Sequence, residues 1–218
     1  IHTIKKMFRK IEQVYLDNLT PDAKETIKIL QDLEVDVSIL TGGFKDMLIN
    51  LANHFGIPLD QIYSNQIFFR NGEYVKIDMK NLLAGNGGKA QRILELVEEG
   101  KSESPIAVLG DGNSEMQTKP VADLVIGFGG FIQREKVKQE ADVFLTEPTF
   151  APLILLLLDP TKIRQIIYKQ PENRDILQKA FDSIQKAKFS SRAIHLKKSI
   201  DKLRGQFDNW RINYTTYP

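Results

Sequence analysis

The chain has 218 residues, 42% hydrophobic and 27% charged, which suits one α/β domain with an appendage or two small domains. It contains no cysteine, which excludes disulfides, thiolate catalysis and Cys-ligated zinc, and its three histidines lie far apart in sequence, which argues against a histidine metal site. The longest apolar run, at 152–158, is far shorter than the roughly 20 residues that span a bilayer. The compartment stays open, with a soluble cytoplasmic protein as the default expectation.

Charge is divided unevenly along the chain, although the net charge is only +2. Residues 161–218 carry 13 Lys and Arg against 5 Asp and Glu, a charge of +8, whereas residues 1–160 carry 17 against 23, a charge of −6. We interpret this division as a core at 1–160 and a basic helical extension at 161–218.

Two helices are predicted at the start. Residues 3–16 show helical spacing of apolar side chains, and a second helix begins at Thr20, which serves as its N-cap, with Pro21 at the first helical position. This second helix runs to about Glu34. The apolar positions that define the first helix are Ile4, Phe8, Ile11 and Tyr15.

A strand and a hairpin are predicted next. Residues 35–40 read as a short strand that ends in the loop Thr41-Gly42-Gly43, and a helix follows at 45–55. Residues 61–69 and 73–77 flank Asn71-Gly72, which is a strong short-range hairpin signal, and predict a hairpin insert at about 61–77.

The remaining core elements alternate between helices and short apolar strands. A helix begins at Lys89 after a Gly-rich stretch, and the strand before Gly110-Asp111-Gly112 is of the buried type. This alternation predicts a Rossmann-like parallel sheet with helices on both faces, in which ligands bind at the carboxyl ends of the strands. The other predicted elements are strands 106–109, 124–126 and 143–145 and helix 133–140.

The extension at 161–218 reads as two amphipathic helices with basic outer faces. It serves either as a packing extension or dimer contact, or as a surface for an acidic partner, a membrane or nucleic acid. Nucleic acid is the least favoured of these partners, because no DNA- or RNA-binding motif is present. The apolar positions are Ile176, Leu177, Ala180, Phe181, Ile184, Ile194, Leu196, Ile200 and Leu203.

Three polar positions could carry chemistry, but each has an ordinary structural explanation when taken alone. The Thr41-Gly42-Gly43 loop is either a phosphate cradle or a tight turn. Asp111, between two glycines at a strand end, is either a Mg²⁺ ligand or the Asp of a common turn. Lys89, at the positive end of a helix dipole, either has a negative partner or is a solvated surface lysine.

The order of these motifs resembles the haloacid dehalogenase superfamily, and phosphoserine phosphatases within it. The resemblance covers roughly residues 18–160 and rests on the segments ILTGGF, IYSNQIFFRNGEYV, GGK, VLGDGNSEM, ADLVIGFGG and REKVKQEADVFL. These segments are specific as a set, because they occur in the order that the superfamily has.

The resemblance implies a role for each matching residue. Thr41 would hydrogen-bond the phosphoryl group beside the Gly42 backbone N–H, and Lys89 would neutralise phosphate and nucleophile. Asp111 would bind Mg²⁺. Glu115 stands where the family usually has an Asp that supports the metal, and its longer side chain leaves that geometry open.

The first motif of the superfamily is not found in this sequence. The superfamily attacks phosphate with the first Asp of an Asp-x-Asp pair and forms an aspartyl-phosphate intermediate. None of the 15 Asp residues is spaced i, i+2 from another. We therefore expect a core without its N-terminal strand and most of its cap, completed by an upstream segment of the same protein or by another polypeptide.

Two functions follow from the resemblance. The first is a Mg²⁺-dependent phosphomonoester hydrolase that acts on a small phosphorylated metabolite, phosphoserine by default, with its nucleophile on the absent segment. The second is a catalytically inactive phosphatase-like module that binds or scaffolds. Thr41, Lys89 and Asp111 together favour the first, because a scaffold would not need them.

Overall fold

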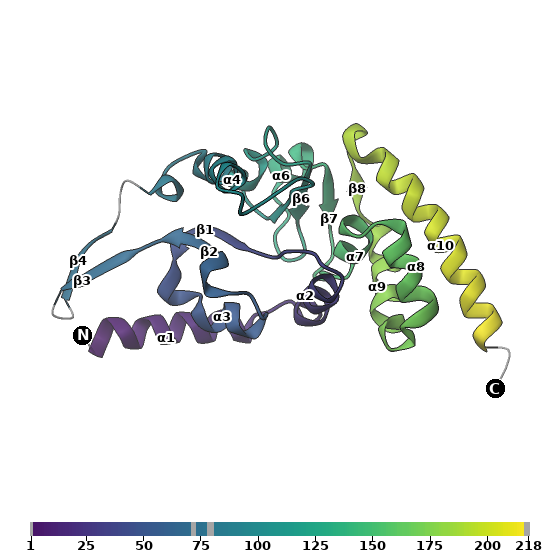
Figure 1. The fold of residues 1–218 in the computed structure, drawn as a ribbon, viewed down its shortest axis with the longest axis horizontal. Coiled ribbons are helices and arrows are strands. Elements are labelled where there is room, and N and C mark those ends of the chain that lie inside the picture. Colours follow the sequence, from purple (N-terminus) through teal and green to yellow (C-terminus); the bar gives the residue numbers. More distant parts are fainter. Residues whose placement is uncertain (1, 71–72, 78–80, 216–218) are drawn as a thin grey trace.

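The computed structural model describes residues 2–70, 73–77 and 81–215. The molecule is elongated: helix α1 (His2–Asp17) and a hairpin of β3 (Ile67–Arg70) and β4 (Glu73–Ile77) lie at one end, and helix α10 (Ile194–Thr215) lies at the other (Figure 1). None of the helices in these ranges is both long and apolar enough to cross a membrane.

Between α1 and residue 105, short helices alternate with strands. These elements are α2 (Ala23–Asp32), β1 (Ile39–Phe44), η1 (Lys45–Met47), α3 (Ile49–His54), η2 (Leu59–Gln61), β2 (Ile62–Asn65), η3 (Leu82–Ala84) and α4 (Gly88–Glu98).

The alternation continues after residue 105 and ends in a helical region. These elements are β5 (Ala107–Gly110), α5 (Asn113–Met116), β6 (Leu124–Phe128), α6 (Glu135–Glu140), β7 (Val143–Leu145), α7 (Pro152–Leu157), α8 (Pro160–Lys169), η4 (Pro171–Asn173), α9 (Arg174–Ile184), β8 (Lys188–Phe189) and η5 (Ser191–Ala193).

The predicted start of the second helix is wrong by two residues. Asp22, not Thr20, is the N-cap of α2, and Thr20 forms a turn in which its carbonyl accepts from the Ala23 N–H at 2.9 Å. The Asp22 carboxylate is used elsewhere: it accepts hydrogen bonds from Thr149 and, at 2.9 Å, from the Phe150 N–H. The contact of Asp22 with Thr149 and Phe150 has therefore outweighed the local preference for Thr20 as the N-cap.

The strand predicted at 35–40 begins later, at Ile39, and continues through the Thr-Gly-Gly segment to Phe44. Its pairing with β2 is parallel, and the register shifts between Leu40 and Phe44, which face Tyr63 and Asn65. Between these paired positions, three residues of β1 lie opposite the single residue Ser64 of β2, and Thr41 is one of the three.

The predicted hairpin is shorter than expected. β2 pairs with β1, so that the antiparallel hairpin starts only at Ile67 and runs to Ile77. The Asn71-Gly72 turn lies outside the described residues. Gln66 separates the two strands that the sequence suggested were one.

Parallel strands flanked by helices confirm the α/β fold class, but they form two sheets instead of one. The first sheet pairs β1 with β2. The second has the order β5-β6-β7-β8, with parallel pairing from β5 to β7 and an antiparallel β8 that the sequence analysis missed. Among the strands that the structure describes, β1 and β5 are therefore each paired on one side only.

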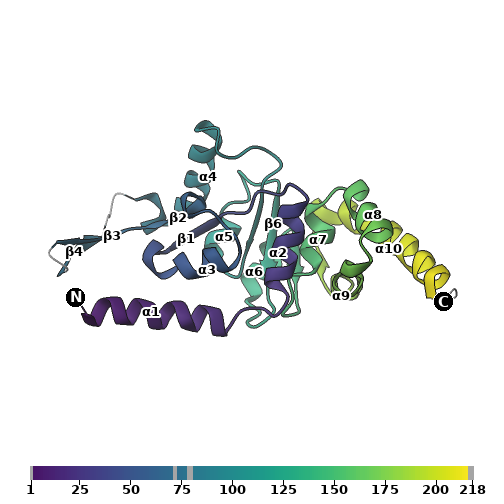
Figure 2. The ribbon, with the colours of Figure 1, turned by 60° about the horizontal axis from the view of Figure 1, so that its bottom comes forward.

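The main apolar core crosses the predicted boundary at residue 160. It joins α2 and β7 to helices of the extension, and Figure 2 shows α2 beside α7. Helix α8 is a third helix of the extension that the pattern at 176–203 did not include. The division into core and extension remains an interpretation of charge, because the fully buried Phe181 and Phe207 pack in the same cluster as Ile126.

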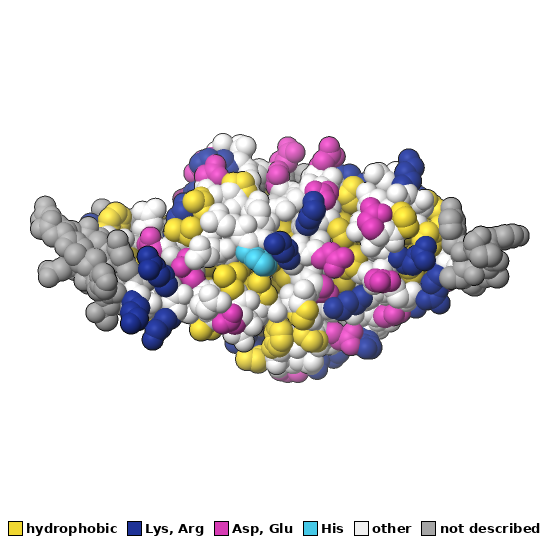
Figure 3. All heavy atoms as spheres, turned by 90° about the horizontal axis from the view of Figure 1, so that it is seen from below, with side chains coloured by type: hydrophobic (Ala, Val, Ile, Leu, Met, Phe, Trp, Pro, Cys, Tyr) yellow, Lys and Arg dark blue, Asp and Glu magenta, His cyan; other side chains and the backbone are white. Residues whose placement is uncertain are grey.

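The face seen from below, where α1, α2 and α3 lie, carries mixed charge. Acidic and basic side chains are interspersed with apolar ones over the described part of this face (Figure 3). On α1, the buried Phe8 and Glu12 face inward, and Glu12 accepts from the Asn50 side chain at 3.0 Å. Tyr15, predicted on the packed face, is 41% exposed.

Candidate functional site

The loop after β5 places Asp111 at the carboxyl end of a parallel strand, as the sequence predicted. Its carboxylate is largely exposed and forms an ion pair with Arg134, whose guanidinium also donates to the Asp111 carbonyl at 2.7 Å. Arg134 comes from the loop between β6 and α6. The two loops at the carboxyl ends of β5 and β6 are thus held together through Asp111.

Glu115 lies in the first turn of α5 and is 7% exposed. One carboxylate oxygen accepts from the Gly112 N–H at 3.0 Å, and the other accepts from the Ser114 hydroxyl at 3.1 Å. A Cβ at Gly110 would lie 2.1 Å from Glu115 Cγ, so only glycine leaves room for this side chain. Of the two glycines in the Gly-Asp-Gly sequence, Gly110 therefore makes room for the Glu115 side chain and Gly112 binds its carboxylate, and the Asp111 between them is exposed.

Lys89, in the first turn of α4, forms an ion pair with Glu115. A cation at the positive end of a helix dipole is unfavourable, and Glu115 supplies the compensating negative charge. Burial by itself raises the pKa of Glu115, but the hydrogen bond and the charge of Lys89 outweigh it and hold that pKa below its ordinary value. The Glu115 carboxylate is therefore charged near neutral pH.

Glycines let the start of α4 approach its neighbours closely. Gly87 has a positive φ of 76°, and a Cβ at Gly88 would lie 1.8 Å from the Leu82 carbonyl oxygen of η3. The Gly87 N–H also donates to the Gln117 side chain at 3.2 Å. This packing sets the direction in which Lys89 leaves the helix.

Thr41 and Gly42 lie in β1 against η3. The Thr41 hydroxyl accepts from the Gly43 N–H at 3.0 Å, and the Gly42 carbonyl accepts from the Asn65 side chain at 2.8 Å. Among the described residues, no hydrogen bond links Thr41 to Lys89, Asp111 or Glu115. The chain thus brings together Lys89, Glu115 and the Asp111 loop, and holds Thr41 separately.

The described residues do not make a Mg²⁺ site by themselves. No group of three or more His, Cys, Asp or Glu in these ranges is arranged to hold a metal ion. Asp111 is paired with Arg134 and Glu115 with Lys89, so each carboxylate already has a cation. Because Mg²⁺ takes oxygen ligands and depends on carboxylates for charge, the present donor set does not fit it.

Arg134 and Asn65 are contacts that the sequence analysis missed. Arg134 lay inside the helix predicted at 133–140. The signal that could have identified it is its place after a parallel strand, because loops at the carboxyl ends of such strands lie at the ligand-binding edge of the sheet. Asn65 lay inside the predicted hairpin strand. A cavity of about 350 Å³ lies beside β2 and α4, and none of Thr41, Lys89 or Asp111 lines it.

Comparisons with known proteins show which proteins this chain resembles. No protein-family model matches the chain. Curated phosphoserine phosphatases of Homo sapiens and Bos taurus are each 34% identical over 131 residues, which is 60% of this chain and 58% of each relative. The chain therefore spans a little over half the length of the curated relatives it matches.

Solved structures show the same fold. A phosphoserine phosphohydrolase-like protein from Francisella tularensis superposes with a TM-score of 0.61 at 22% identity, covering 71% of this chain and 70% of that one. A phosphoserine phosphatase in its apo form gives 0.52 at 22% identity, over 63% and 66% of the two chains. The chain is therefore similar in sequence to phosphoserine phosphatases and shares the fold of these solved structures.

Proposed function

We propose that this chain is the larger part of a phosphomonoester hydrolase that acts on a small phosphorylated metabolite through an aspartyl-phosphate intermediate. The nucleophile is carried by an additional strand, from upstream in the same protein or from another polypeptide. The observation that supports the proposal is that β1, which contains Thr41, and β5, which leads to Asp111, belong to separate sheets, and each of them pairs with one strand among the described residues.

The exposure of the strands supports an additional strand between β1 and β5. All three residues of β7 and the three central residues of β6 are buried. In β5 no residue is buried, and in β1 none is buried either. Central strands of parallel sheets are normally covered on both faces and paired on both sides, so β1 and β5 have the properties of strands that lack a neighbour.

The residues of this chain would neutralise the charge of the phosphoryl group and hold it in position. Lys89 would exchange part of its interaction with Glu115 for the phosphoryl group and the nucleophile. Thr41 and the Gly42 N–H would orient the phosphoryl oxygens from the side of β1. Phosphoryl transfer depends mainly on such positioning and charge neutralisation.

Mg²⁺ dependence belongs to the same proposal. The additional strand would bring the carboxylates that Asp111 lacks, so that a metal site forms only in the completed protein. Phosphoserine is the substrate we propose, because the curated relatives that this chain resembles are named phosphoserine phosphatases.

A second candidate is an inactive phosphatase-like binding module. The pairing of Asp111 with Arg134 and of Glu115 with Lys89 favours it, because both carboxylates already have cationic partners. In this case no strand would join β1 and β5, or the strand that does so would lack a nucleophilic Asp.

One experiment separates the two candidates. The coding sequence upstream of Ile1 is determined, the longer product is expressed, and phosphate release from phosphoserine and other phosphomonoesters is measured with Mg²⁺. An upstream apolar strand with Asp-x-Asp and Mg²⁺-dependent turnover supports the hydrolase. A strand without that pair, or a product with no phosphatase activity, supports the binding module.

A further inference from the structure

Helices α8 and α10 enclose a cavity of about 260 Å³, at the end of the molecule opposite α1 (Figure 1). It is lined by Pro160 and Arg164 of α8 and by residues of α10. The α10 residues that line it are Ser199, Lys202, Leu203 and Gln206. Apart from Pro160, every residue that lines the cavity belongs to the extension, and none of them is assigned a role in phosphoryl transfer.

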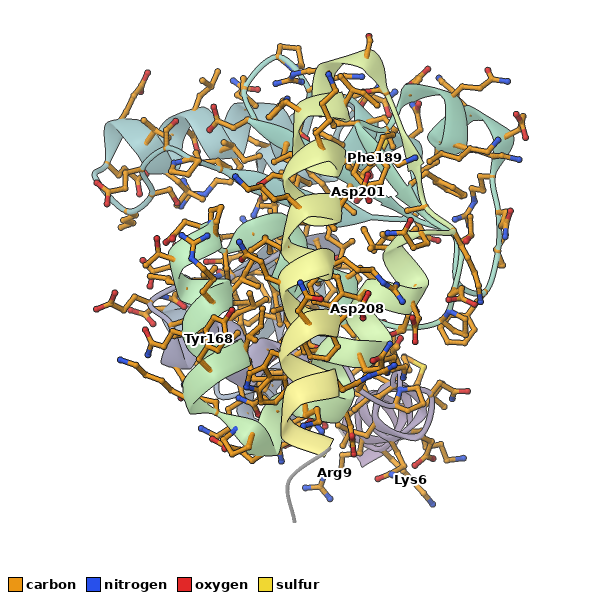
Figure 4. All side chains as sticks on the ribbon, turned by 90° about the vertical axis from the view of Figure 1, so that its right-hand side faces the viewer. Lys6, Arg9, Tyr168, Phe189, Asp201 and Asp208 are labelled. Carbon is orange, nitrogen blue, oxygen red and sulfur yellow. The ribbon has the colours of Figure 1, made fainter. Side chains whose placement is uncertain are left out.

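The polar and the acidic residues of α10 lie on different faces of the helix. Ser199, Lys202 and Gln206 follow each other at intervals of three and four residues and therefore share the face toward α8. Figure 4 shows Asp201 and Asp208 on the opposite side of α10 from the helix that bears Tyr168, which is α8. The groove thus receives a lysine from α10 but neither of these acids.

Both acids are engaged elsewhere. Asp208 lies 3.5 Å from the guanidinium of Arg204, and Asp201 accepts from the Gln185 side chain at 3.4 Å. Asp159, which precedes α8, accepts from the backbone N–H groups of Thr161 and Lys162 as the helix cap. These carboxylates do not neutralise the groove.

Two cations from different helices line the cavity without an acidic partner. Within the described residues, Arg164 and Lys202 form no ion pair, and the contact of Arg164 is with the Thr161 hydroxyl at 3.4 Å. An unpaired guanidinium and an unpaired ammonium that share one cavity repel each other, so a bound anion would relieve this repulsion. Arg offers a planar fork of donors and Lys a compact charge, and both groups commonly bind phosphate.

Neutral polar groups complete the lining. The amide oxygen of Gln206 is buried and has no hydrogen-bond partner. Because the amide oxygen and nitrogen exchange places by a half-turn of the side chain, Gln206 can present either a donor or an acceptor to a ligand. The buried Leu203 forms an apolar floor. Pockets for drug-sized ligands measure roughly 300–1,000 Å³, so this one suits a compact group.

We propose that the α8–α10 groove is a binding site for a phosphate group, held by Arg164 and Lys202 and oriented by Ser199 and Gln206. The site is independent of the phosphate position proposed beside Lys89. It gives the basic extension a ligand of definite chemistry in place of a general attraction to acidic partners.

The test uses the 218-residue chain and inorganic phosphate as the probe. Binding is measured by titration calorimetry, and thermal unfolding is followed in phosphate and in chloride at equal ionic strength. We expect phosphate to bind and to stabilise the chain more than chloride does. The double variant Arg164→Gln/Lys202→Gln should bind phosphate weaker by on the order of tenfold or more, because it loses both charge-assisted contacts.

A matched control separates a site from general attraction. Lys169→Gln/Lys198→Gln removes the same charge from the same two helices, at exposed positions that do not line the cavity. It should keep the wild-type affinity. Equal loss in both double variants, or no advantage of phosphate over chloride in the wild-type chain, overturns the proposal.

Two further arms identify where the phosphate sits and where it comes from. The variant Lys89→Gln should still bind phosphate, because it leaves the groove intact. If Lys89→Gln abolishes phosphate binding and Arg164→Gln/Lys202→Gln does not, the proposal is overturned. Cosedimentation with phosphatidylcholine vesicles containing phosphatidic acid shows whether a lipid carries the group. Vesicle binding lost only in the groove variant assigns a lipid headgroup, and phosphate binding without vesicle binding assigns a free phosphorylated ligand.

Discussion

The strands of this protein differ in how much of their surface the rest of the chain covers. β6 and β7 are buried between helices, and β7 gains the antiparallel β8 from the extension. β1 and β5 are half-exposed, each is paired on one side only among the described strands, and they carry the loops of the candidate site. The difference indicates that the covered half supplies most of the packing, whereas the open half carries the polar groups of the candidate site.

The largest expected effect tests the covered half. Phe181 is fully buried and stacks on Phe207 with ring centroids 5.2 Å apart. We expect Phe181→Ala to lower the free energy of unfolding by about 3–5 kcal/mol, as large buried aromatic truncations do. Phe68→Ala makes the same chemical change in the hairpin, where Phe68 is 40% exposed, and should cost less than about 1 kcal/mol. Urea unfolding measures both, and similar losses would contradict the comparison.

The second prediction tests the open half in the strand-completed protein. Lys89→Ala and Asp111→Asn should each lower kcat by about 10²–10³, because each removes one electrostatic contact to the reacting group or its metal. Folding should survive, since both side chains lie at the ends of elements. Lys28→Ala, which changes an exposed lysine of α2, serves as the control. Near-normal turnover in both site variants would refute the site assignment.

The third prediction concerns the attachment of the extension to the covered half. Arg192 donates to the carbonyls of Ala122 and Asp123, and its guanidinium lies 3.3 Å from the fully buried Asp142 carboxylate. We expect Arg192→Ala to lower the free energy of unfolding by about 1–3 kcal/mol, because buried acceptors lose their donor. Hydrogen exchange should show β8 opening before β6. No change in either measurement would make Arg192 a surface residue without structural role.

The smallest expected effect is on stability in acid. The folded pKa of Glu115 lies below its ordinary value of 4.5, so the carboxylate stabilises the fold above that pH and the contribution is lost as the pH falls through the folded pKa. Glu115→Gln should therefore lower stability near neutral pH and flatten the decline below pH 4.5. Asp22 in the covered half also has a lowered pKa, so Asp22→Asn is the matched comparison. An unchanged acid profile in Glu115→Gln would show that the ion pair with Lys89 does not form.

The sequence correctly predicted several helices and one strand whose formation depends on the residues of that element alone. Helical spacing predicted α1, α4 and α9, and β7 was found at the predicted residues 143–145. The Gly-rich stretch before Lys89 was identified as the place where a helix begins, and a negative partner was one of the two alternatives that the helix dipole left open for Lys89. The α/β fold class followed from the alternation of helices and strands, and the resemblance to phosphoserine phosphatases followed from the order of motifs.

What the sequence determined by itself was therefore the set of elements, their order and the residue types at their ends. Tertiary structure decided the partners: Glu115 for Lys89 at a separation of 26 residues, Arg134 for Asp111 at 23, and Asp22 for Thr149 at 127. It also decided that the parallel strands are divided between two sheets and that β8 joins β7. Spacing along the chain reports which face of an element a residue occupies, but ion pairs, caps and strand neighbours depend on which distant segments the core brings together.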